Sequence, residues 1–340
     1  MSASAFYPAA RGARKILVCD LGFLGDTIHL FPALREVRAA WPEAALHVMA
    51  ADHVKDLLRL LPGIGPIWGY PRHPKSPPWY RLLPLVRALR RERFDAVINL
   101  NGSNRSSLLT RLTGAPLRLG RTPERRGGPL WPLCFTHAVT VPYDEETPLF
   151  AQRWRCLEAA GLPVSAPRFE AAVPPEEQAA ADALLDGISG FVHVSPFTTM
   201  DAKELHPDDL ARALDALMAR FPGVPWAVSC AGNERERTKL AALLARLERK
   251  PWKTFPGTLT PLRLAAAMRR ARLHVGGDSG GVHLATLLGV PSVAWFRQEP
   301  PLTRWTPRGG RDRVLHAPND GSGFLRLAPE PFLAAAAAIL

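Results

Sequence analysis

The stretch Leu273–Leu288 (LHVGGDSGGVHLATLL) holds the densest group of residues suited to anion binding. A predicted strand runs into two glycines, and four short residues then open a predicted helix: Asp278, Ser279, Gly280 and Gly281. Small residues at a helix N-terminus let an anion reach the free backbone amides, which carry the positive end of the helix dipole. Because glycine loses much entropy on folding, four glycines in six residues favour ligand binding over mere packing. His283 lies one turn into this helix, and the pattern fits either a core histidine or a ligand contact.

Two threonines and a lysine form a second candidate anion site within Ser195–His206 (SPFTTMDAKELH). This segment follows a predicted strand and precedes a predicted helix, so we expect a loop at the carboxyl edge of a sheet. The hydroxyls of Thr198 and Thr199 and the ammonium of Lys203 are suited to hold a phosphate. The structural alternative is a polar connection that caps the next helix.

A glycine-bearing turn and a carboxylate follow the first predicted strand, in Asp20–Pro32 (DLGFLGDTIHLFP). Gly22 and Gly25 permit a tight turn. Asp26 falls at the start of the next predicted helix, where a carboxylate can simply cap free N–H groups. The stretch is a poor dinucleotide-binding motif because the third glycine of G-x-G-x-x-G is missing.

Strand and helix patterns alternate along both halves of the chain, which predicts two parallel sheets covered by helices. The expected strands are Lys15–Asp20, Ala45–Ala50, Pro66–Tyr70, Phe94–Asn99, Phe191–Ser195, Pro225–Cys230, Leu273–Val275 and Ser292–Phe296. The expected helices are Thr27–Ala40, His53–Leu61, Pro77–Arg93, Ser106–Thr113, Phe150–Ala160, Pro207–Ala219, Glu234–Leu247, Pro261–Arg270 and Gly280–Leu288. Thr122–Trp131 has no clear periodicity and is expected to be a loop.

This alternation divides the chain into two Rossmann-like domains, expected at residues 1–165 and 189–323. A Pro-rich linker is expected at 166–188 and a C-terminal helix at 324–340. Ligands of such sheets bind at the carboxyl ends of the strands, so we expect a binding cleft between the two domains.

Composition excludes several classes of protein. The 340 residues are 47% hydrophobic and 22% charged, which excludes a disordered or collagen-like chain. No apolar run reaches the ~20 residues that span a bilayer, and the first residues lack an apolar secretory segment, so we expect a cytoplasmic location. The four cysteines form no C-x-x-C pair, which argues against a thiolate zinc site and a disulfide scaffold.

The net charge of +12 is concentrated in the first half of the chain. Residues 1–165 contain 22 Lys/Arg against 13 Asp/Glu, a net of +9, whereas residues 166–340 contain 21 against 18. This excess suits an anionic substrate, an anionic membrane surface or nucleic acid, or it is a solvated surface without a partner.

Three segments, in this order and at these distances, resemble glycosyltransferase family 9, the ADP-heptose:lipopolysaccharide heptosyltransferases: LGFLGDTIHLFPAL, TTMDAK and GGDSGGVHLATLLGVP. FDAVINLNGSNRSSLLTRLTGAPLRLG also resembles the middle of the family's first domain. G-D-x-x-H-x-x-P at Gly25–Pro32 and T-T-x-D-x-K at Thr198–Lys203 are most similar to heptosyltransferase I. The resemblance covers roughly residues 15–300.

The resemblance implies a GT-B fold, with the acceptor bound by the first domain and the nucleotide sugar by the second. It implies inverting, metal-independent transfer of heptose from ADP-heptose to a Kdo/heptose core acceptor, with no cofactor. Asp26 matches the proposed general base. Lys203, Thr198 and Thr199 match the diphosphate contacts, and Asp278, Ser279, Gly280, Gly281 and His283 match the donor loop. The ribose-binding glutamate matches Glu234 better than Glu236.

The acceptor site matches less closely. Asp20 stands where members of the family usually have Arg, Lys or Thr, which places a second carboxylate near the base. The acceptor-side residues of the family do not map onto Phe150–Arg155. Candidates for acceptor binding are Gly25, Arg105, Arg118, Arg121, Arg125 and Arg126, because arginine forks fit phosphates and carboxylates.

We therefore expect a monomeric heptosyltransferase that contacts the cytoplasmic face of the inner membrane, where its anionic lipid-linked acceptor lies. Three alternatives remain at this stage. A dinucleotide-dependent oxidoreductase is disfavoured by the incomplete glycine motif. A nucleic-acid-binding protein is suggested by charge alone, and the chain contains no recognisable nucleic-acid-binding module. A GT-B protein that binds but does not catalyse, or that uses another nucleotide sugar, fits the unusual Asp20.

Overall fold

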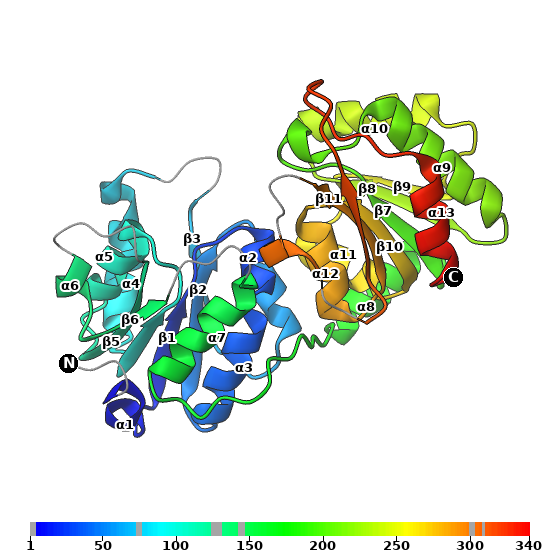
Figure 1. Ribbon diagram of the computed structural model, residues 1–340. Helices are drawn as coiled ribbons and strands as arrows, with labels where there is room; N and C mark the ends of the chain where they lie inside the picture. Colours follow the sequence, from blue (N-terminus) through cyan, green and yellow to red (C-terminus); the bar gives the residue numbers. More distant parts are fainter. Residues whose placement is uncertain (1–4, 73–76, 124–130, 142–146, 299–302, 308–309) are drawn as a thin grey trace. The chain divides into compact units, whose positions relative to one another are not determined.

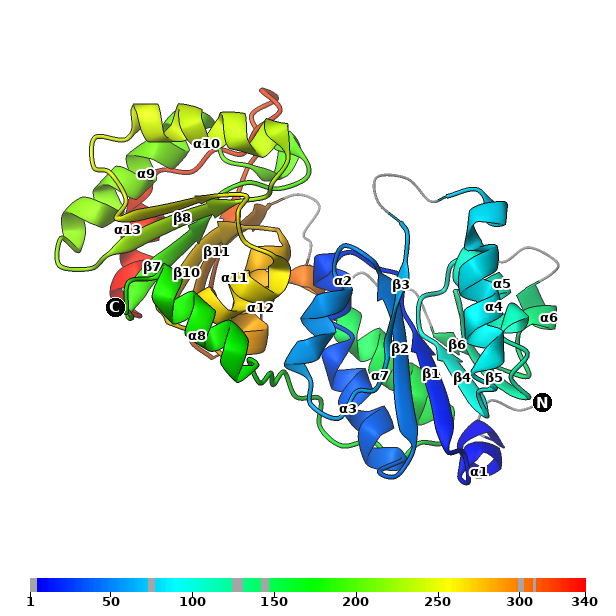
Figure 2. The same cartoon turned by 180° about the vertical axis from the view of Figure 1, so that it is seen from behind.

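The computed structural model describes residues 5–72, 77–123, 131–141, 147–298, 303–307 and 310–340. The chain forms two compact units, unit 1 (Met1–Ala172) and unit 2 (Val173–Leu340) (Figures 1 and 2). The segment expected as a linker, 166–188, contains helix α8 (Pro175–Leu184), whose Ala181 is buried in unit 2 beside Phe191.

Unit 1 is built on a parallel six-stranded sheet with the strand order β3-β2-β1-β4-β5-β6. Cys19 at the end of β1 is in register with Met49 of β2 and Asn99 of β4, so the residues after these strands gather at one edge. The strands are β1 (Lys15–Cys19), β2 (Ala45–Ala51), β3 (Ile67–Tyr70), β4 (Ala96–Asn99), β5 (Leu117–Pro123) and β6 (His137–Val141).

Helices cover both faces of this sheet. Leu17 and Cys19 of β1 pack with Leu89 of α4 and Leu109 of α5. Ile16 and Val18 alternate with them, point to the other face and are fully buried too, as the two-residue period of a strand requires. The helical segments are α1 (Phe6–Ala10), α2 (Leu24–Ile28), α3 (Phe31–Ala40), η2 (Lys55–Leu60), η3 (Trp79–Leu82), α4 (Leu83–Arg91), α5 (Asn104–Leu112), α6 (Trp131–Cys134) and α7 (Leu149–Ala159).

Unit 2 repeats this plan with the strand order β12-β11-β10-β7-β8-β9, again all parallel. Its strands are β7 (Phe191–Ser195), β8 (Trp226–Cys230), β9 (Lys253–Pro256), β10 (Ala271–Gly277), β11 (Ser292–Arg297) and β12 (Arg313–Ala317). Its helical segments besides α8 are η4 (Asp201–Lys203), α9 (Pro207–Arg220), α10 (Glu234–Arg246), α11 (Pro261–Met268), α12 (Gly280–Leu288), η5 (Thr303–Trp305) and α13 (Pro329–Ala337).

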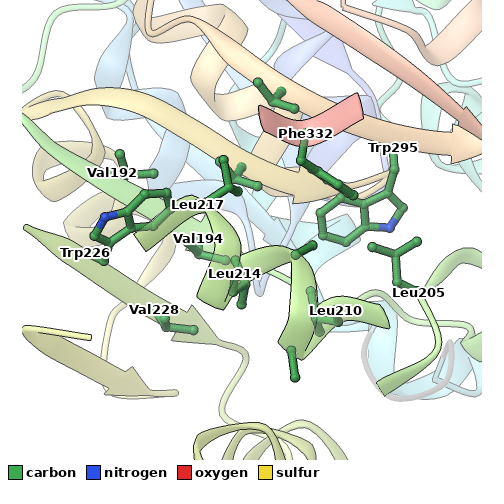
Figure 3. Close-up of a cluster of buried hydrophobic side chains, with 14 of the residues drawn as sticks. Val192, Val194, Leu205, Leu210, Leu214, Leu217, Trp226, Val228, Trp295 and Phe332 are labelled. Carbon is green, nitrogen blue, oxygen red and sulfur yellow. The ribbon is translucent and has the colours of Figure 1, made fainter. Parts of the chain in front are cut away.

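The main core of unit 2 lies between its sheet and the helices α9 and α13 (Figure 3). Leu210, Leu214 and Leu217 recur at the helical period on α9 and face the sheet, as expected for an amphipathic helix. The rings of Trp295 on β11 and Phe332 on α13 meet edge to face with centroids 5.9 Å apart. This rigid base supports the loops that follow β7 and β10.

In both sheets the strand order reverses at one pair of neighbouring strands, so that successive strands are added on opposite sides of this pair. The change lies between β1 and β4 in unit 1 and between β7 and β10 in unit 2. Loops diverge there, which leaves room for a ligand at the carboxyl ends of the strands. All three chemistry-bearing segments of the sequence follow one of these four strands.

The structure differs from the expected elements in several places. The expected helix Thr27–Ala40 is divided into α2 and α3, because Pro32 has no N–H and its ring disfavours a continuous helix across residue 28. The expected helix His53–Leu61 is a 3₁₀ helix, η2, and the expected loop Thr122–Trp131 begins inside β5. The expected C-terminal helix 324–340 is shorter, at α13. The sequence prediction contains no counterpart of β5, β6, β9, β12, α1, α6 or α8.

Candidate active site

A buried ion pair occupies the switch point of unit 1. Asp20 follows β1 and is only 1% exposed. Its carboxylate accepts hydrogen bonds from Arg153 Nε at 2.7 Å, from the Gly22 amide at 3.0 Å and from Asn101 Nδ2 at 3.2 Å. Asn101 follows β4, so residues from both switch-point strands and from α7 converge on this one carboxylate. A charge this deeply buried requires such partners.

Arg153 links the two carboxylates of this site. Its Nε binds Asp20, and its Nη2 lies 3.5 Å from Asp26 Oδ1. Burial alone would lower the pKa of Arg153, but attraction to Asp20 and Asp26 outweighs burial, so its pKa is raised above the usual value. Its Nη1 is buried and has no hydrogen-bond partner among the described residues. Arg153 therefore has one donor group left over in a site that already contains two carboxylates.

Asp26 is both a helix cap and a partly accessible carboxylate. It is the third residue of the short helix α2, and its Oδ2 accepts a hydrogen bond from the Phe23 amide at 3.0 Å. Its side chain is 27% exposed, compared with 1% for Asp20. Gly22 makes room for it, because a Cβ at Gly22 would overlap the Cβ of Asp26. Of the two carboxylates, Asp26 is the one that a substrate can reach.

A second ion pair lies at the switch point of unit 2. Lys203, at the end of η4, extends to Asp278, and Nζ and Oδ2 are 2.6 Å apart. The Asp278 side chain is 5% exposed and the Lys203 side chain 31%. Lys203 follows β7 and Asp278 follows β10, so the two sequence motifs meet in space as their positions on neighbouring strands require. The Lys203 side chain therefore remains partly accessible to solvent.

The loop that holds Lys203 is braced by α10. Glu204, 3% exposed, accepts the Thr198 amide at 2.9 Å and pairs with Arg235 and Lys239. Asp201 pairs with the same two cations. Thr198 is buried and bonds within its own turn, to the amide and carbonyl of Met200, whereas Thr199 is exposed. Only Thr199 of the two predicted hydroxyls is therefore presented to solvent.

Close packing surrounds the first turn of α12. Ser279 is the N-cap residue and makes no side-chain cap, so the first amides of this nine-residue helix keep their donor capacity. A Cβ at Gly281 would overlap Ser195 Oγ, and a Cβ at Gly277 would meet Trp295 Nε1 at 2.7 Å. These glycines are needed for the approach of backbone to neighbouring side chains. Gly280 is half-buried beside them.

Three buried histidines support this edge of unit 2. His193 of β7 and His274 of β10 share a contact between their Nδ1 atoms at 3.0 Å, and Nε2 of His193 bonds Ser229 Oγ at 2.9 Å. Burial lowers the pKa of His193 to about 4 and also lowers that of His274. His283, with 4% exposure and its ring 5.5 Å from Trp305, has a pKa lowered to about 4 by burial. All three rings are neutral at pH 7.

The structure separates the two candidate ribose ligands. Glu236 is buried and caps α10, accepting hydrogen bonds from the Ala231 amide at 2.8 Å and from Asn233 Nδ2 at 3.3 Å. Asn233 in turn accepts the Glu236 amide at 2.9 Å, which completes a reciprocal cap. Glu234 is exposed at the first position of the helix. The Glu236 side chain therefore stabilises the start of α10, whereas the Glu234 side chain is accessible to a ligand.

The candidate acceptor arginines are dispersed. Arg121 lies in β5 and donates to Gln152 Oε1 at 2.9 Å. Arg105 donates to the Pro77 carbonyl at 2.7 Å and lies over the Trp79 ring. Arg118 donates to the carbonyls of Cys134 and Ala115. Arg125 and Arg126 lie outside the described residues, and Gly25 lies in α2 beside Asp26.

Sequence reasoning missed the residues that hold these groups in place. Arg153 and Asn101 lie far along the chain from Asp20, and Arg235 lies far from Glu204, so nothing in local spacing indicates these partners. Within the described ranges, no cluster of three or more His, Cys, Asp or Glu side chains is placed to hold a metal ion. No helix in those ranges is long and apolar enough to cross a membrane.

The sequence model of glycosyltransferase family 9 (heptosyltransferase) matches residues 82–322. The chain belongs to this family. It is therefore a glycosyltransferase, and its two parallel six-stranded sheets form the GT-B fold predicted from the sequence.

Relatives in the family are similar over nearly the whole chain. The lipopolysaccharide core heptosyltransferase OpsX of Haemophilus influenzae is 22% identical over 302 residues, which cover 89% of this chain and 84% of OpsX. A family 9 glycosyltransferase of Veillonella parvula has a TM-score of 0.82 at 19% identity, covering 96% of this chain and 97% of that one. The E. coli heptosyltransferase WaaC with ADP has a TM-score of 0.75 at 18% identity, covering 96% of this chain and all of that chain.

Proposed function

We propose that this glycosyltransferase transfers a heptose from ADP-heptose to an anionic, lipid-linked glycan of the lipopolysaccharide-core type, with inversion and without a metal. The observation that carries the proposal is the presence of a partly accessible carboxylate, Asp26, at one switch point and of a cation, Lys203, beside a helix N-terminus at the other. These are the groups that a metal-free transfer to a hydroxyl requires. OpsX and WaaC, named as heptosyltransferases, support the choice of sugar, and the ADP in the WaaC structure supports the choice of base.

On the acceptor side, Asp26 serves as the general base. It removes the proton of the acceptor hydroxyl as that oxygen bonds the anomeric carbon of the donor sugar. Arg153 acts as a positioning residue: it holds Oδ1 of Asp26 while the Phe23 amide holds Oδ2. The guanidinium also keeps Asp20 paired, so the second carboxylate does not compete for the proton. Attack from the face opposite the leaving group inverts the anomeric carbon.

On the donor side, the bond that breaks joins the anomeric carbon to a β-phosphate oxygen of ADP. The negative charge that develops on this phosphate is met by Lys203 and by the first amides of α12. Asp278 orients the ammonium, and Thr199 is an exposed hydroxyl on the same loop. Glu234 is the accessible carboxylate for the ribose hydroxyls. Fixed dipoles and a lysine thus take the place that a divalent cation occupies in metal-dependent transferases.

The proposed acceptor also agrees with the positive charge of the first half of the chain and with a reaction at a membrane surface. A lipid-linked core glycan is anionic, which suits the basic first half of the chain. The reaction takes place at the cytoplasmic face of the inner membrane, and the enzyme acts as a monomer that needs no nucleic acid.

The donor is tested by thermal shift with ADP, UDP and GDP, each with and without EDTA. A ligand that binds the folded state raises the apparent melting temperature by mass action. We expect ADP to stabilise the protein most and EDTA to change nothing, in binding or in turnover of ADP-heptose. A requirement for Mg²⁺ or Mn²⁺, or stronger stabilisation by UDP or GDP, contradicts the proposal.

Two variants separate the roles of the two sites. Asp26→Asn keeps an oxygen for the Phe23 amide but loses the base, so the rate should fall about 10²–10⁴-fold while ADP affinity is unchanged. Lys203→Met should weaken ADP binding by about 10-fold or more, because a charge-assisted contact is lost. Because Lys203→Met leaves Asp278 unpaired, the double variant Lys203→Met/Asp278→Asn is the control that restores stability without restoring ADP affinity. Normal turnover in Asp26→Asn would show that Asp26 is only a cap.

A further inference from the structure

One surface of unit 1 exposes most of the large apolar side chains that the described residues present to solvent. Seven such side chains are more than a third exposed, and five of them lie on η3, α4, α5 and α6: Trp79, Tyr80, Leu83, Leu108 and Leu133. Tyr80 is 65% exposed and Leu133 67%. Single exposed apolar side chains are common on protein surfaces, but five large ones on adjoining elements indicate an interaction surface.

The contacts of these elements place the side chains on one surface. Arg105, at the start of α5, lies with its guanidinium 5.3 Å from the Trp79 ring of η3. Helices α4 and α5 are in contact, and a Cβ added at Gly114, just past the end of α5, would lie 3.9 Å from Nε of Arg90 at the end of α4. Helices α4 and α5 therefore run side by side, and both bury their inner faces in the same cluster with Leu17 and Val97. Their solvent-facing sides consequently point away from the sheet together, and α6 lies next to α5 (Figures 1 and 2).

The same surface is basic and contains no acidic side chain on its helices. Its exposed cations are Arg81, Arg87, Arg90, Arg91 and Arg111. None of the five forms an ion pair within the described part of the chain, and η3, α4, α5 and α6 contain no Asp or Glu. Arg111 also lowers the pKa of neighbouring Arg118, after the larger effect of burial, which indicates like charges held close together. We call these five arginines and the five apolar residues above the basic–aromatic face.

The outer side of unit 2 is different. On α10, Arg235 and Arg246 are both paired with carboxylates, as are Lys239 of the same helix and Arg326 near α13. Arg220, Arg249 and Arg269 of unit 2 are exposed and form no ion pair among the described residues, but no cluster of exposed large apolar side chains accompanies them, since Met200 is the one such residue described in unit 2. Unit 1 is distinguished by the combination of unpaired arginines with exposed aromatic and leucine side chains on the same helices.

We propose that the basic–aromatic face docks unit 1 on an anionic phospholipid bilayer, a role that rests on the proposed lipid-linked acceptor. Trp and Tyr prefer the headgroup level of a membrane, since their rings are apolar and their polar ends stay hydrated. Leu83, Leu108 and Leu133 enter the acyl boundary, and the arginines meet the lipid phosphates. A soluble anionic ligand would match the arginines but would leave these leucines and Tyr80 in water.

The orientation fits the chemistry. Helices that follow parallel strands begin at the carboxyl edge of the sheet, so η3 and the start of α5 lie at the edge that carries the active site. Arg105 connects them there, because it also lies 3.4 Å from the hydroxyl of Tyr70, the last residue of β3. The aromatic end of the face and Asp26 are thus on the same edge of unit 1, where an acceptor anchored in the bilayer would arrive.

Vesicle co-sedimentation of the full chain tests this assignment without donor or acceptor, so its failure is independent of the proposed transfer reaction. Binding to phosphatidylcholine vesicles that contain about 30% phosphatidylglycerol is compared with binding to pure phosphatidylcholine vesicles. Each is measured at about 50 mM and about 500 mM salt. The test variant is Arg87→Gln/Arg90→Gln/Arg91→Gln. The matched control, Arg220→Gln/Arg249→Gln/Arg269→Gln, removes the same charge from exposed positions of unit 2.

We expect binding to the anionic vesicles to fall on the order of 100-fold in the test variant and less than about 3-fold in the control. Tyr80→Ser/Leu83→Ser should weaken the binding that persists at high salt. Equal losses in test and control variants would show that net charge alone drives binding. Binding of the wild type to heparin but not to vesicles would assign the face to a soluble polyanion. Either result, or no vesicle binding at all, overturns the proposal.

Discussion

The buried pair of Asp20 and Arg153 should be the most sensitive point of unit 1. The two side chains are 1% and 5% exposed, and their charged atoms are 2.7 Å apart. Arg153→Met removes the cation while keeping much of the side chain's length, and it leaves Asp20 charged in a buried site. Removal of one partner of such a pair typically costs 3–5 kcal/mol, because the remaining charge is uncompensated.

The size of the effect follows from the remaining contacts of Asp20. Its bonds to the Gly22 amide and to Asn101 persist in Arg153→Met, so we expect about 3 kcal/mol rather than the upper limit. For a unit of this length that corresponds to roughly 10 °C in melting temperature. Asp20→Asn should cost less, because Asn can still accept the Gly22 amide and Arg153 retains Asp26. The double variant Asp20→Asn/Arg153→Met should recover about 1–3 kcal/mol relative to additivity.

Calorimetry gives the melting temperature, and hydrogen exchange of peptides that cover β1 and β4 assigns the change to unit 1. Turnover provides the readout that a merely structural role would not move. Arg153→Met should lower kcat because Asp26 loses the donor at Oδ1, and Arg153→Lys should restore part of kcat. A melting temperature within 1 °C of the wild type together with unchanged kcat would refute this reasoning. Additive single and double variants would show that the pair is not coupled.

Three further predictions concern unit 2. Gly281→Ala should weaken ADP binding and cost about 1–3 kcal/mol in stability, because its Cβ overlaps Ser195, whereas Gly223→Ala, with open space around it, should change neither. Glu236→Ala should destabilise the protein by about 1 kcal/mol and leave ADP affinity unchanged. Glu234→Ala should weaken ADP binding and leave the melting temperature unchanged. Calorimetry and thermal shift with ADP check both results. The folded-state pKa of His283, about 4, lies below its unfolded value, so the unfolded state binds more protons between pH 6.5 and 4. The free energy of unfolding should therefore decrease as the pH is lowered from 6.5 to 4, by up to about 3 kcal/mol for this ring. Urea unfolding of His283→Gln should show a shallower dependence of this free energy on pH than the wild type.

The periodic parts of the fold were predictable from sequence, and the reasons are visible in particular elements. Strand β1 and helices α9, α10 and α12 are predicted within one or two residues because their apolar residues recur at the right period and their ends carry Pro, Asn or Gly signals. Strands β5, β6, β9 and β12 were not predicted; β6, β9 and β12 are edge strands and β5 lies next to the edge. His137–Val141, for example, alternates buried and exposed residues in a short run that resembles a loop. The division at Pro32 depends on a single residue within a helix-like pattern.

The donor motifs were predictable and their supports were not. Glycines, a lysine and a carboxylate at the ends of neighbouring strands can be recognised locally, and the sheet order brings Lys203 and Asp278 together. The brace formed by Glu204 with Arg235 and Lys239 connects residues more than 30 positions apart. The partner of Asp20 lies 133 residues away on α7. Such pairings are set by tertiary packing, and one sequence contains no local signal for them.

The position of Asp20 bears on whether unit 1 can catalyse at all. Two carboxylates close together share their protons, and a site with both unpaired would hold one of them neutral or repel an anionic acceptor. Here the guanidinium of Arg153 offsets one charge, and geometry decides which. The 2.7 Å contact and two further hydrogen bonds belong to Asp20, while Asp26 keeps a looser 3.5 Å contact and its exposure. One net negative charge remains, on the carboxylate that a substrate can reach. This chain places a carboxylate after β1 and supplies the compensating cation from α7. The local charge is thereby compatible with a base at Asp26, which favours an active transferase over a protein that only binds its ligands.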